Sequence, residues 1–348
     1  MNPSSGLDAL TQALDLVADG VDLSAQQAEA AFDRFMSGSA SEIQMAGLLI
    51  GLRAKGLAPA EVAGGVRALR SAMRPVVYSD PSKLVDTAGT GGGSVTTFNI
   101  STAAAFVVAG AGAPVAKHGN RSFTSRSGSA DVLEALGVVI DLTPEQMAHT
   151  LERAGIVFMF APLLHPAMRH VGPVRRGLGV TTVMNILGPL TNPAGARRQV
   201  IGVADERLLD LIPGALLELG HLRALVVHGA PGIDEVSPIG PTRVAELRDG
   251  RIERYEIEPG VLGLTPVDAE RLAGGEPDEN AAIIEAVLEG RDSAARSAVV
   301  ANAAAGLLVA DLADSWSSAA DLARRTIDDG RAATALNALR DATASTSG

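Results

Sequence analysis

The chain has 348 residues, of which 47% are hydrophobic and 20% charged, and this composition is typical of a globular protein with about two domains. It contains no cysteine, which excludes a disulfide framework, a thiolate zinc site and a cysteine nucleophile. The formal net charge of −11 argues against a nucleic-acid-binding protein, although a local cluster of cations can still bind a small anion.

The start of the chain carries four aspartates and no apolar run within its first thirty residues, so we expect no signal peptide. The most apolar uncharged stretches, 100–116 and 297–310, are shorter than the ~20 residues of a spanning helix. We therefore expect no membrane partner. The absence of cysteine is compatible with a reducing cytoplasm, where we place the protein.

Residues 1 to about 75 show only helical patterns. Leu10, Leu14 and Val17 recur at helical spacing, and Ser24 with Gln27 forms a capping box. Either Ser39 or Ser41 can cap the third helix. The expected helices cover residues 7–17, 25–35, 43–55 and 59–73.

From Lys83 onward, short apolar runs alternate with helical patterns, which predicts an α/β fold with a central, mostly parallel sheet flanked by helices. The expected strands are Leu84–Thr87, Val115–Ala116, Val138–Leu142, Val157–Phe160, Val200–Ala204 and Ala224–His228. Residues 244–257 form an antiparallel hairpin pattern with Asp249-Gly250 at its turn.

A basic helix, Pro173–Thr182, and a loop, Asn185–Pro193, interrupt this alternation. Because they lie between two α/β halves, we expect them to return to the helical part of the chain. The predicted domains are thus a small helical domain, residues 1–75 completed by about 173–193, and a larger α/β domain, residues 80–170 and 195–340.

The stretch Asp86–Thr102 (DTAGTGGGSVTTFNIST) follows an apolar strand and precedes a small-residue helix. Four glycines lie within five positions, and Ser, Thr and Asn donors follow. A strand, a glycine loop and a helix bring backbone N–H groups together around an anion. A tight surface turn would need only one glycine pair, so the pattern favours close approach of the backbone to a ligand.

A second polar segment, Lys117–Ser129 (KHGNRSFTSRSGS), follows the next strand and combines cations with hydroxyl groups. Alone, it is equally typical of a solvated loop. Together with the glycine loop it predicts a site for a phosphorylated ligand at the carboxyl edge of the sheet.

Two further segments carry charges with a chemical use. Asp234-Glu235, in a loop after the strand Ala224–His228, is a carboxylate pair that suits Mg²⁺, whereas an isolated pair of this kind is usually a solvated turn. In His165–Arg176, either Arg175 or Arg176 can bind a carboxylate bidentately, and the other of these neighbours must point elsewhere.

The chain resembles the anthranilate phosphoribosyltransferase family of tryptophan biosynthesis over residues 7 to about 339. The motifs that carry this resemblance are GTGGG followed by TTFNIST, KHGNRS, SGSADVLEALG, HPAMRH with PVRR, NILGPLTNP and DEVSPIGPT. The resemblance implies a small helical domain joined to a larger α/β domain, a homodimer formed through the helical domain, and Mg²⁺ as the cofactor. It also implies transfer of the phosphoribosyl group of 5-phosphoribosyl diphosphate (PRPP) to the amine of anthranilate, with release of diphosphate.

The same resemblance implies residue roles. Because an aromatic amine is already unprotonated near neutral pH, we assign no general acid or base. Asp234, Glu235 and Ser101 would bind Mg²⁺, and Gly89, Asn120 and Arg175 would contact anthranilate. The PRPP site would be lined by Gly89, Gly92, Gly93, Thr97, Asn99, Ile100, Ser101, Thr102, Lys117, His118, Gly119, Asn120, Arg121, Ser122, Phe123, Thr124, Ser125 and Ser129.

One position departs from the family, which commonly has an aspartate where this chain has Gly93. Backbone N–H contacts to phosphate survive this change, but a carboxylate at the end of the loop is lost. The alternative functions are a pyrimidine nucleoside phosphorylase, which is similar in fold and glycine loop, and a non-catalytic nucleic-acid-binding relative of the same fold.

Overall fold

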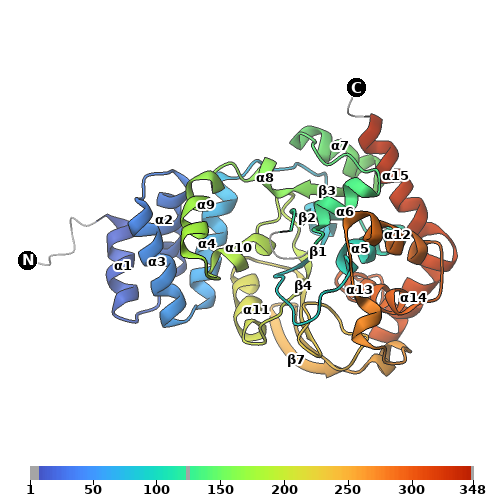
Figure 1. Ribbon diagram of the computed structural model, residues 1–348. Coiled ribbons are helices and arrows are strands. Elements are labelled where there is room, and N and C mark those ends of the chain that lie inside the picture. The colour runs from blue at the N-terminus through green and yellow to red at the C-terminus, as the bar shows by residue number, and fades with distance from the viewer. Residues whose placement is uncertain (1–7, 123–125, 346–348) are drawn as a thin grey trace, which may run out of the picture.

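The computed structural model places a bundle of helices beside a seven-stranded sheet (Figure 1). It describes residues 8–122 and 126–345. The chain begins with α1 (Ala9–Ala18), α2 (Ala25–Met36), α3 (Glu42–Lys55) and α4 (Pro59–Ala72). A short 3-10 turn, η1 (Pro81–Lys83), leads into the sheet.

The sheet has the strand order β3-β2-β1-β4-β5-β6-β7. The first five strands in this order are parallel, whereas β6 pairs antiparallel with β5 and β7 pairs antiparallel with β6. The strands are β1 (Val85–Gly89), β2 (Val115–Gly119), β3 (Ile156–Phe160), β4 (Arg198–Gly202), β5 (Arg223–Gly229), β6 (Thr242–Arg248) and β7 (Arg251–Ile257). The predicted α/β fold class, with a small helical domain beside a mostly parallel sheet, is confirmed.

Alternating strand residues give the sheet two apolar faces. In β5, Leu225 and Val227 enter one core, whereas Ala224 and Val226 enter the core shared with α1–α4. The first core is covered by α5 (Ile100–Gly110), α6 (Ser129–Ala135), α12 (Pro277–Leu288), α13 (Ala294–Val309), α14 (Trp316–Asp328) and α15 (Arg331–Ser345). On the opposite face lie α11 (Leu208–Glu218) and α7 (Pro144–Ala154).

Local signals set several boundaries as predicted. Ser24 caps α2, and Ser41 rather than Ser39 caps α3 by accepting the Gln44 N–H at 3.3 Å. The β6–β7 hairpin turns at Asp249 and Gly250, whose φ angles of 51° and 74° are those of a two-residue primed turn.

The predicted strand Val138–Leu142 is wrong. These residues connect α6 to α7 and do not join the sheet, in which β2 pairs directly with β3. Val138, Ile140 and Leu142 are nevertheless buried. An apolar run packed between helices therefore has the same sequence signature as a buried strand.

The predicted loop Asn185–Pro193 is also wrong in part, because it contains α10 (Met184–Leu190). Leu187 packs there against α4, where a Cβ at Gly65 would lie 2.9 Å from its side chain. The basic helix begins earlier than expected, as α9 (Met168–Leu178), and ends at Gly179 in the left-handed conformation. It follows the short helix α8 (Ala161–Leu164). Tertiary packing thus overrides the local preference of Gly188 and Pro189 for a loop.

Figure 1 shows α9 and α10 beside the N-terminal helices, at the junction with the sheet. Val171, Val174, Met184 and Leu187 share the core of α1–α4. Among residues 8–122 and 126–345, no helix has both the length and the apolar character needed to cross a membrane.

Candidate active site

The acidic loop that carries Asp234 and Glu235 lies across the carboxyl ends of three strands. Each of these strands ends in a glycine: Gly89 in β1, Gly202 in β4 and Gly229 in β5. A Cβ atom would overlap the Asp234 carboxylate at Gly89, the Asp234 carbonyl at Gly202 and the Glu235 carbonyl at Gly229. Missing side chains therefore make the room for the acidic loop, and the sequence prediction did not single out Gly202 or Gly229.

The glycine loop is hydrogen-bonded to the acidic loop. The Gly91 N–H donates to an Asp234 carboxylate oxygen at 2.8 Å, and the Ser94 N–H donates to the Gly232 carbonyl at 2.8 Å. Gly91 and Gly92 have φ angles of 71° and 82°, which strongly favour glycine. The two loops, 143 residues apart in sequence at Gly91 and Asp234, thus form one structure.

Gly93 faces the same carboxylate. A Cβ atom at this position would lie 3.3 Å from the Gly232 carbonyl oxygen and 3.4 Å from an Asp234 carboxylate oxygen. An aspartate there would bring a second negative charge close to Asp234. The departure from the family pattern therefore leaves Asp234 with one fewer acidic neighbour.

The far end of the glycine loop is held by a chain of side-chain hydrogen bonds. Asn99 donates to the Ser127 carbonyl at 3.2 Å and accepts from Asn280 at 2.9 Å. Thr97 pairs with Ala273 in an isolated β-bridge. Ile100 and Thr102 are buried in the first turn of α5. This end of the loop is therefore held by Ser127, by α12 and by the segment before α12.

Lys117 is buried in β2 beneath these loops. Its Nζ donates to the Thr87 carbonyl and lies 3.3 Å from the Ser101 hydroxyl. Burial lowers the pKa of Lys117, and the negative charges of Asp86 and Glu235 oppose that shift. Lys117 is thus a cation held between the glycine loop and the acidic loop.

Glu235 has the opposite perturbation. Desolvation and the neighbouring Asp234 raise its pKa to about 8, although Lys117 and the Ser101 N–H stabilise the charged form. Glu235 and Ser101 line a cavity of about 10 Å³, with Thr87 and Asn302 also in its wall. A carboxylate in these surroundings lacks sufficient positive charge, and a divalent cation would supply it.

Asp86 supports this arrangement from below. It is fully buried and accepts hydrogen bonds from Asn192 at 2.8 Å, from Gln199 at 3.2 Å and from the His118 N–H at 3.2 Å. Burial raises its pKa, and Lys117 is the main opposing influence. Asp86 therefore balances the charge of Lys117 and positions the start of the KHGNRS segment.

Asn302 of α13 holds the acidic loop from the opposite side. Its side chain accepts the Val236 N–H at 2.8 Å and donates to the Val236 carbonyl at 3.0 Å. The sequence prediction did not include this residue. A single polar side chain in the otherwise apolar run 298–309 was the available signal.

The Lys117–Ser129 segment turns back on itself after β2. Gly119 ends the strand against the Ser129 hydroxyl, which donates to the Asn120 carbonyl at 3.2 Å. Ser122 donates its N–H to Asp131 at 3.3 Å. The predicted residues Phe123, Thr124 and Ser125 lie outside the described residues.

Arg121 is not the free cation that the sequence suggested. Its guanidinium pairs with Asp131 at 2.7 Å and Glu134 at 2.5 Å, which raises its pKa, and it stacks over Phe160. The carboxylates of α6 therefore neutralise it in this structure. Asp131 and Glu134 lie three residues apart in the motif SGSADVLEALG and so share one face of α6, but their pairing with Arg121 depends on how the preceding loop folds back.

His118 links this segment to the entrance of α9. Its Nε2 lies 3.2 Å from Nε2 of His165, which requires one ring to donate and the other to accept. Burial lowers the pKa of His118 to about 3 and that of His165 to about 4. The pair is thus neutral and joins β2 to the segment before α9.

Arg175 lies on α9 and is partly buried. Burial lowers its pKa, and within residues 8–122 and 126–345 its guanidinium has no hydrogen bond or ion pair. Its neighbour Arg176 is exposed. Of the two arginines left open by sequence reasoning, Arg175 is therefore the one with an unsatisfied guanidinium in a partly dry environment.

The chain is similar to proteins of known activity over almost its whole length. Residues 81–333 match the glycosyl transferase family a/b domain, and residues 11–73 match the helical bundle domain of the same family. Anthranilate phosphoribosyltransferase of Methanosarcina acetivorans is 49% identical over 326 residues, which cover 94% of this chain and 88% of that protein. The Thermomicrobium roseum enzyme of the same name is 50% identical over 94% of this chain and 95% of its own length.

The chain is also similar to solved structures of proteins with this name. The crystal structure of anthranilate phosphoribosyltransferase from Thermus thermophilus superposes with a TM-score of 0.91 at 41% identity, covering 97% of this chain and all of that one. The Saccharomyces cerevisiae enzyme in complex with PRPP and Mg has a TM-score of 0.87 at 27% identity and covers 97% of this chain and 98% of its own.

Proposed function

The chain belongs to the anthranilate phosphoribosyltransferase branch of the glycosyl transferase family, and on that basis we propose how its residues divide the work of the reaction. The protein transfers the phosphoribosyl group of PRPP to anthranilate. The anthranilate amine forms a bond to ribose C1, the bond from C1 to the diphosphate oxygen breaks, and diphosphate leaves with the electron pair while the amine loses a proton.

The observation that carries the site assignment is the acidic loop lying over the glycine-ended strands, directly beside the glycine loop and Lys117. This arrangement concentrates N–H donors, one cation and two carboxylates at the carboxyl edge of a parallel sheet. We assign PRPP to it, with the N–H groups of the glycine loop and the Asn99–Thr102 turn at the start of α5 contacting phosphate oxygens.

Mg²⁺ is the cofactor of this activity, and the residues present fit it. Among the described residues no group of three or more His, Asp or Glu side chains could hold a metal alone. Mg²⁺ usually takes one or two carboxylates together with waters and substrate phosphates. We propose that Asp234 and Glu235, with the Ser101 hydroxyl, hold the ion, which would neutralise charge on the departing diphosphate.

The acceptor is proposed to lie near α9. Arg175 would bind the anthranilate carboxylate through its free guanidinium, and Asn120 and Gly89 would contact the same molecule. An aromatic amine is already unprotonated near neutral pH. No residue is therefore assigned as a strong general base, and orientation of the two substrates supplies much of the rate.

The decisive experiment follows loss of anthranilate fluorescence in the presence of PRPP and Mg²⁺. Product formation with a dependence on all three components supports the assignment. A flat trace with folded protein would overturn it. Phosphate-dependent cleavage of thymidine or uridine would instead reveal a nucleoside phosphorylase, and a gel shift without turnover would reveal the nucleic-acid-binding alternative.

An exposed apolar face of α3 is the basis on which we propose a homodimer. On α3, Ile43 is 85% exposed and Ile50 is 38% exposed, and their spacing of seven residues places them on one helical face. We propose that two copies of the chain form a homodimer through this face of the helical domain.

We also propose that residues 173–193 complete the helical domain, which the burial of Val174 and Leu187 supports. We further propose that the protein is cytoplasmic.

A further inference from the structure

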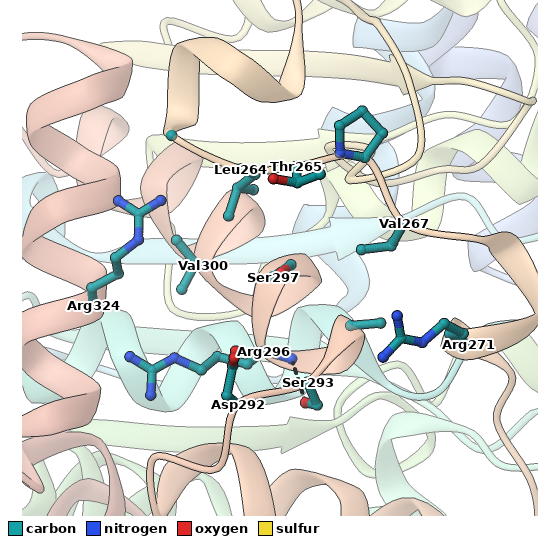
Figure 2. A pocket seen from close by; sticks show the side chains of 13 residues that line it. Leu264, Thr265, Val267, Arg271, Asp292, Ser293, Arg296, Ser297, Val300 and Arg324 are labelled. Atoms are coloured by element: carbon teal, nitrogen blue, oxygen red, sulfur yellow. Dashed lines mark hydrogen bonds between the residues drawn. The ribbon is translucent and has the colours of Figure 1, made fainter.

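A second, larger cavity lies apart from the acidic and glycine loops. It has a volume of about 650 Å³ and opens between the loop 263–267 and the N-terminal half of α13, with α14 at one side (Figure 2). The loop connects two short 3-10 turns, η2 (Pro259–Leu262) and η3 (Ala269–Leu272). None of the residues assigned to PRPP, anthranilate or Mg²⁺ lines this cavity.

The lining is positively charged in a protein that is acidic overall. Three arginines, Arg271, Arg296 and Arg324, face one aspartate, Asp292. The guanidinium of Arg271 extends toward the middle of the cavity in Figure 2 and has no ion pair or hydrogen bond within the described part of the chain. A free guanidinium at a cavity of this size is available for a ligand.

The other two arginines are fixed in place by groups outside the cavity. Arg296 donates to the Gly290 carbonyl and to Asp328, both at 2.7 Å. Arg324 donates to the Leu262 carbonyl and to Asp321. Their positions are therefore set before any ligand arrives, which lowers the entropy cost of binding.

The N-terminus of α13 adds to the positive potential. Ser293 caps this 16-residue helix by accepting the Arg296 N–H, and the first turn contains no acidic residue. Ser297 lies near the centre of Figure 2, and Ser293 lies below it. The apolar side chains of Leu264, Val267 and Val300 cover another part of the wall.

We propose that this cavity binds a small organic anion, with its oxyanion group at Arg271 and the start of α13 and its apolar body against Leu264, Val267 and Val300. The oxyanion is a phosphate or a carboxylate group. Arginine binds both bidentately. The volume lies within the range of about 300–1,000 Å³ that is usual for small-molecule sites.

The walls of the cavity are connected to the active-site loops. The Leu272 carbonyl accepts the Phe98 N–H at 3.0 Å, next to the end of the glycine loop. The Val267 N–H donates to the Pro238 carbonyl at 3.0 Å, after the acidic loop. Asn302, which holds Val236, lies on α13 between these contacts. The cavity wall and both active-site loops are thus joined by backbone and side-chain hydrogen bonds.

Binding is tested by calorimetry on the full chain without substrates, using phenyl phosphate and benzoate as the two probes. At least one probe should bind the wild type, and Arg271→Ala should weaken that binding by about tenfold or more. The tighter probe identifies the oxyanion class. Ser297→Leu, which fills the floor of the cavity, should have the same effect. Arg325→Ala, an exposed arginine next to Arg324, is the matched control and should bind as the wild type does.

Active-site binding of the same probes is measured separately, as their inhibition constants against PRPP and anthranilate. These constants should change by less than about threefold in Arg271→Ala. Equal calorimetric affinity in wild type, Arg271→Ala and Ser297→Leu would overturn the proposal, as would probe binding that PRPP and anthranilate displace completely. Because the calorimetry needs no turnover, its failure is distinguishable from failure of the transferase assignment.

Discussion

The proposed donor side and acceptor side of the site are built in different ways. On the donor side, Lys117 lies between Asp86 and Glu235, and the glycine and acidic loops are hydrogen-bonded to each other. On the acceptor side, Arg175 projects from a helix without a partner in the described structure. The donor side is thus largely preorganised before substrate arrives, whereas Arg175 leaves one charge to be satisfied by the substrate.

This difference separates two kinds of variant. A change on the donor side disturbs contacts that also hold the loops together, so catalysis, metal affinity and stability should change together. A change at Arg175 removes only a contact to substrate, so one Michaelis constant should change alone. Variants on each side therefore test this separation.

The largest effect is expected from the double variant Asp234→Asn, Glu235→Gln. It removes both carboxylates proposed to hold Mg²⁺, so kcat/KM at fixed Mg²⁺ should fall by about 100-fold or more, and half-maximal activity should require more Mg²⁺. Initial rates across a Mg²⁺ titration provide the measurement. An unaltered titration would reduce the acidic loop to a structural turn.

Gly202→Ala tests whether the strand ends position the acidic loop. The new Cβ would overlap the Asp234 carbonyl, and backbone on both sides leaves little room to adjust. We expect a loss of about 3 kcal/mol in the free energy of unfolding, together with a higher Mg²⁺ requirement. Denaturant titration and Mg²⁺-dependent rates measure the two effects.

The control for this variant is Gly177→Ala in α9. A Cβ there meets nothing within 4 Å, and alanine is favoured over glycine in a helix. It should leave stability unchanged or slightly higher. If both alanine variants behaved alike, the close approach at Gly202 would not be what sets the loop.

Arg175→Ala is expected to act on one substrate. It should raise the KM for anthranilate about 10- to 100-fold, the effect of losing a charge-assisted bidentate contact, with the KM for PRPP changed less than about threefold. Arg176→Ala is the matched control because Arg176 is exposed. An unchanged KM for anthranilate would show that Arg175 does not bind the acceptor. The proposed difference between the donor side and the acceptor side would then be wrong.

The donor side was also the easier half to predict from sequence. Strand–glycine–helix order and the position of Asp234-Glu235 after a strand are local patterns, and parallel strands bring such patterns to one edge. The roles of Gly202 and Asn302 could not be predicted in this way, because each depends on a loop that arrives from elsewhere in the chain. The ion pairs of Arg121 with Asp131 and Glu134 of α6 were likewise not predicted, and its place in the PRPP site stays a prediction.

Packing between distant segments also explains the two elements that were predicted wrongly from the sequence. Val138–Leu142 is apolar because it is buried, and burial alone does not distinguish a strand from a connection between helices. Met184–Leu190 is helical because Leu187 packs against α4, despite Gly188 and Pro189 in its sequence. In both places, packing between distant segments decides the local conformation.

The smallest expected effect concerns pH, and it tests the link between the two sides. His118 and His165 have pKa values lowered by burial to about 3 and about 4, below the ordinary value of 6.5. The unfolded chain therefore binds more protons than the folded chain between these values, so stability is fully present above about pH 6.5 and falls as the pH drops toward 4. Each such histidine contributes a slope of up to about 1.4 kcal/mol per pH unit.

His165→Gln should reduce this slope, because it removes one titrating group at the contact between β2 and the segment before α9. Denaturant titrations at pH 7, 6 and 5 measure it, and His149→Gln is the control because His149 is exposed. His221, whose pKa burial lowers to about 3, should maintain part of the slope in the variant. If His165→Gln kept the full pH dependence, the pair would not be neutral and buried, and the junction would join the two sides less tightly than the 3.2 Å contact implies.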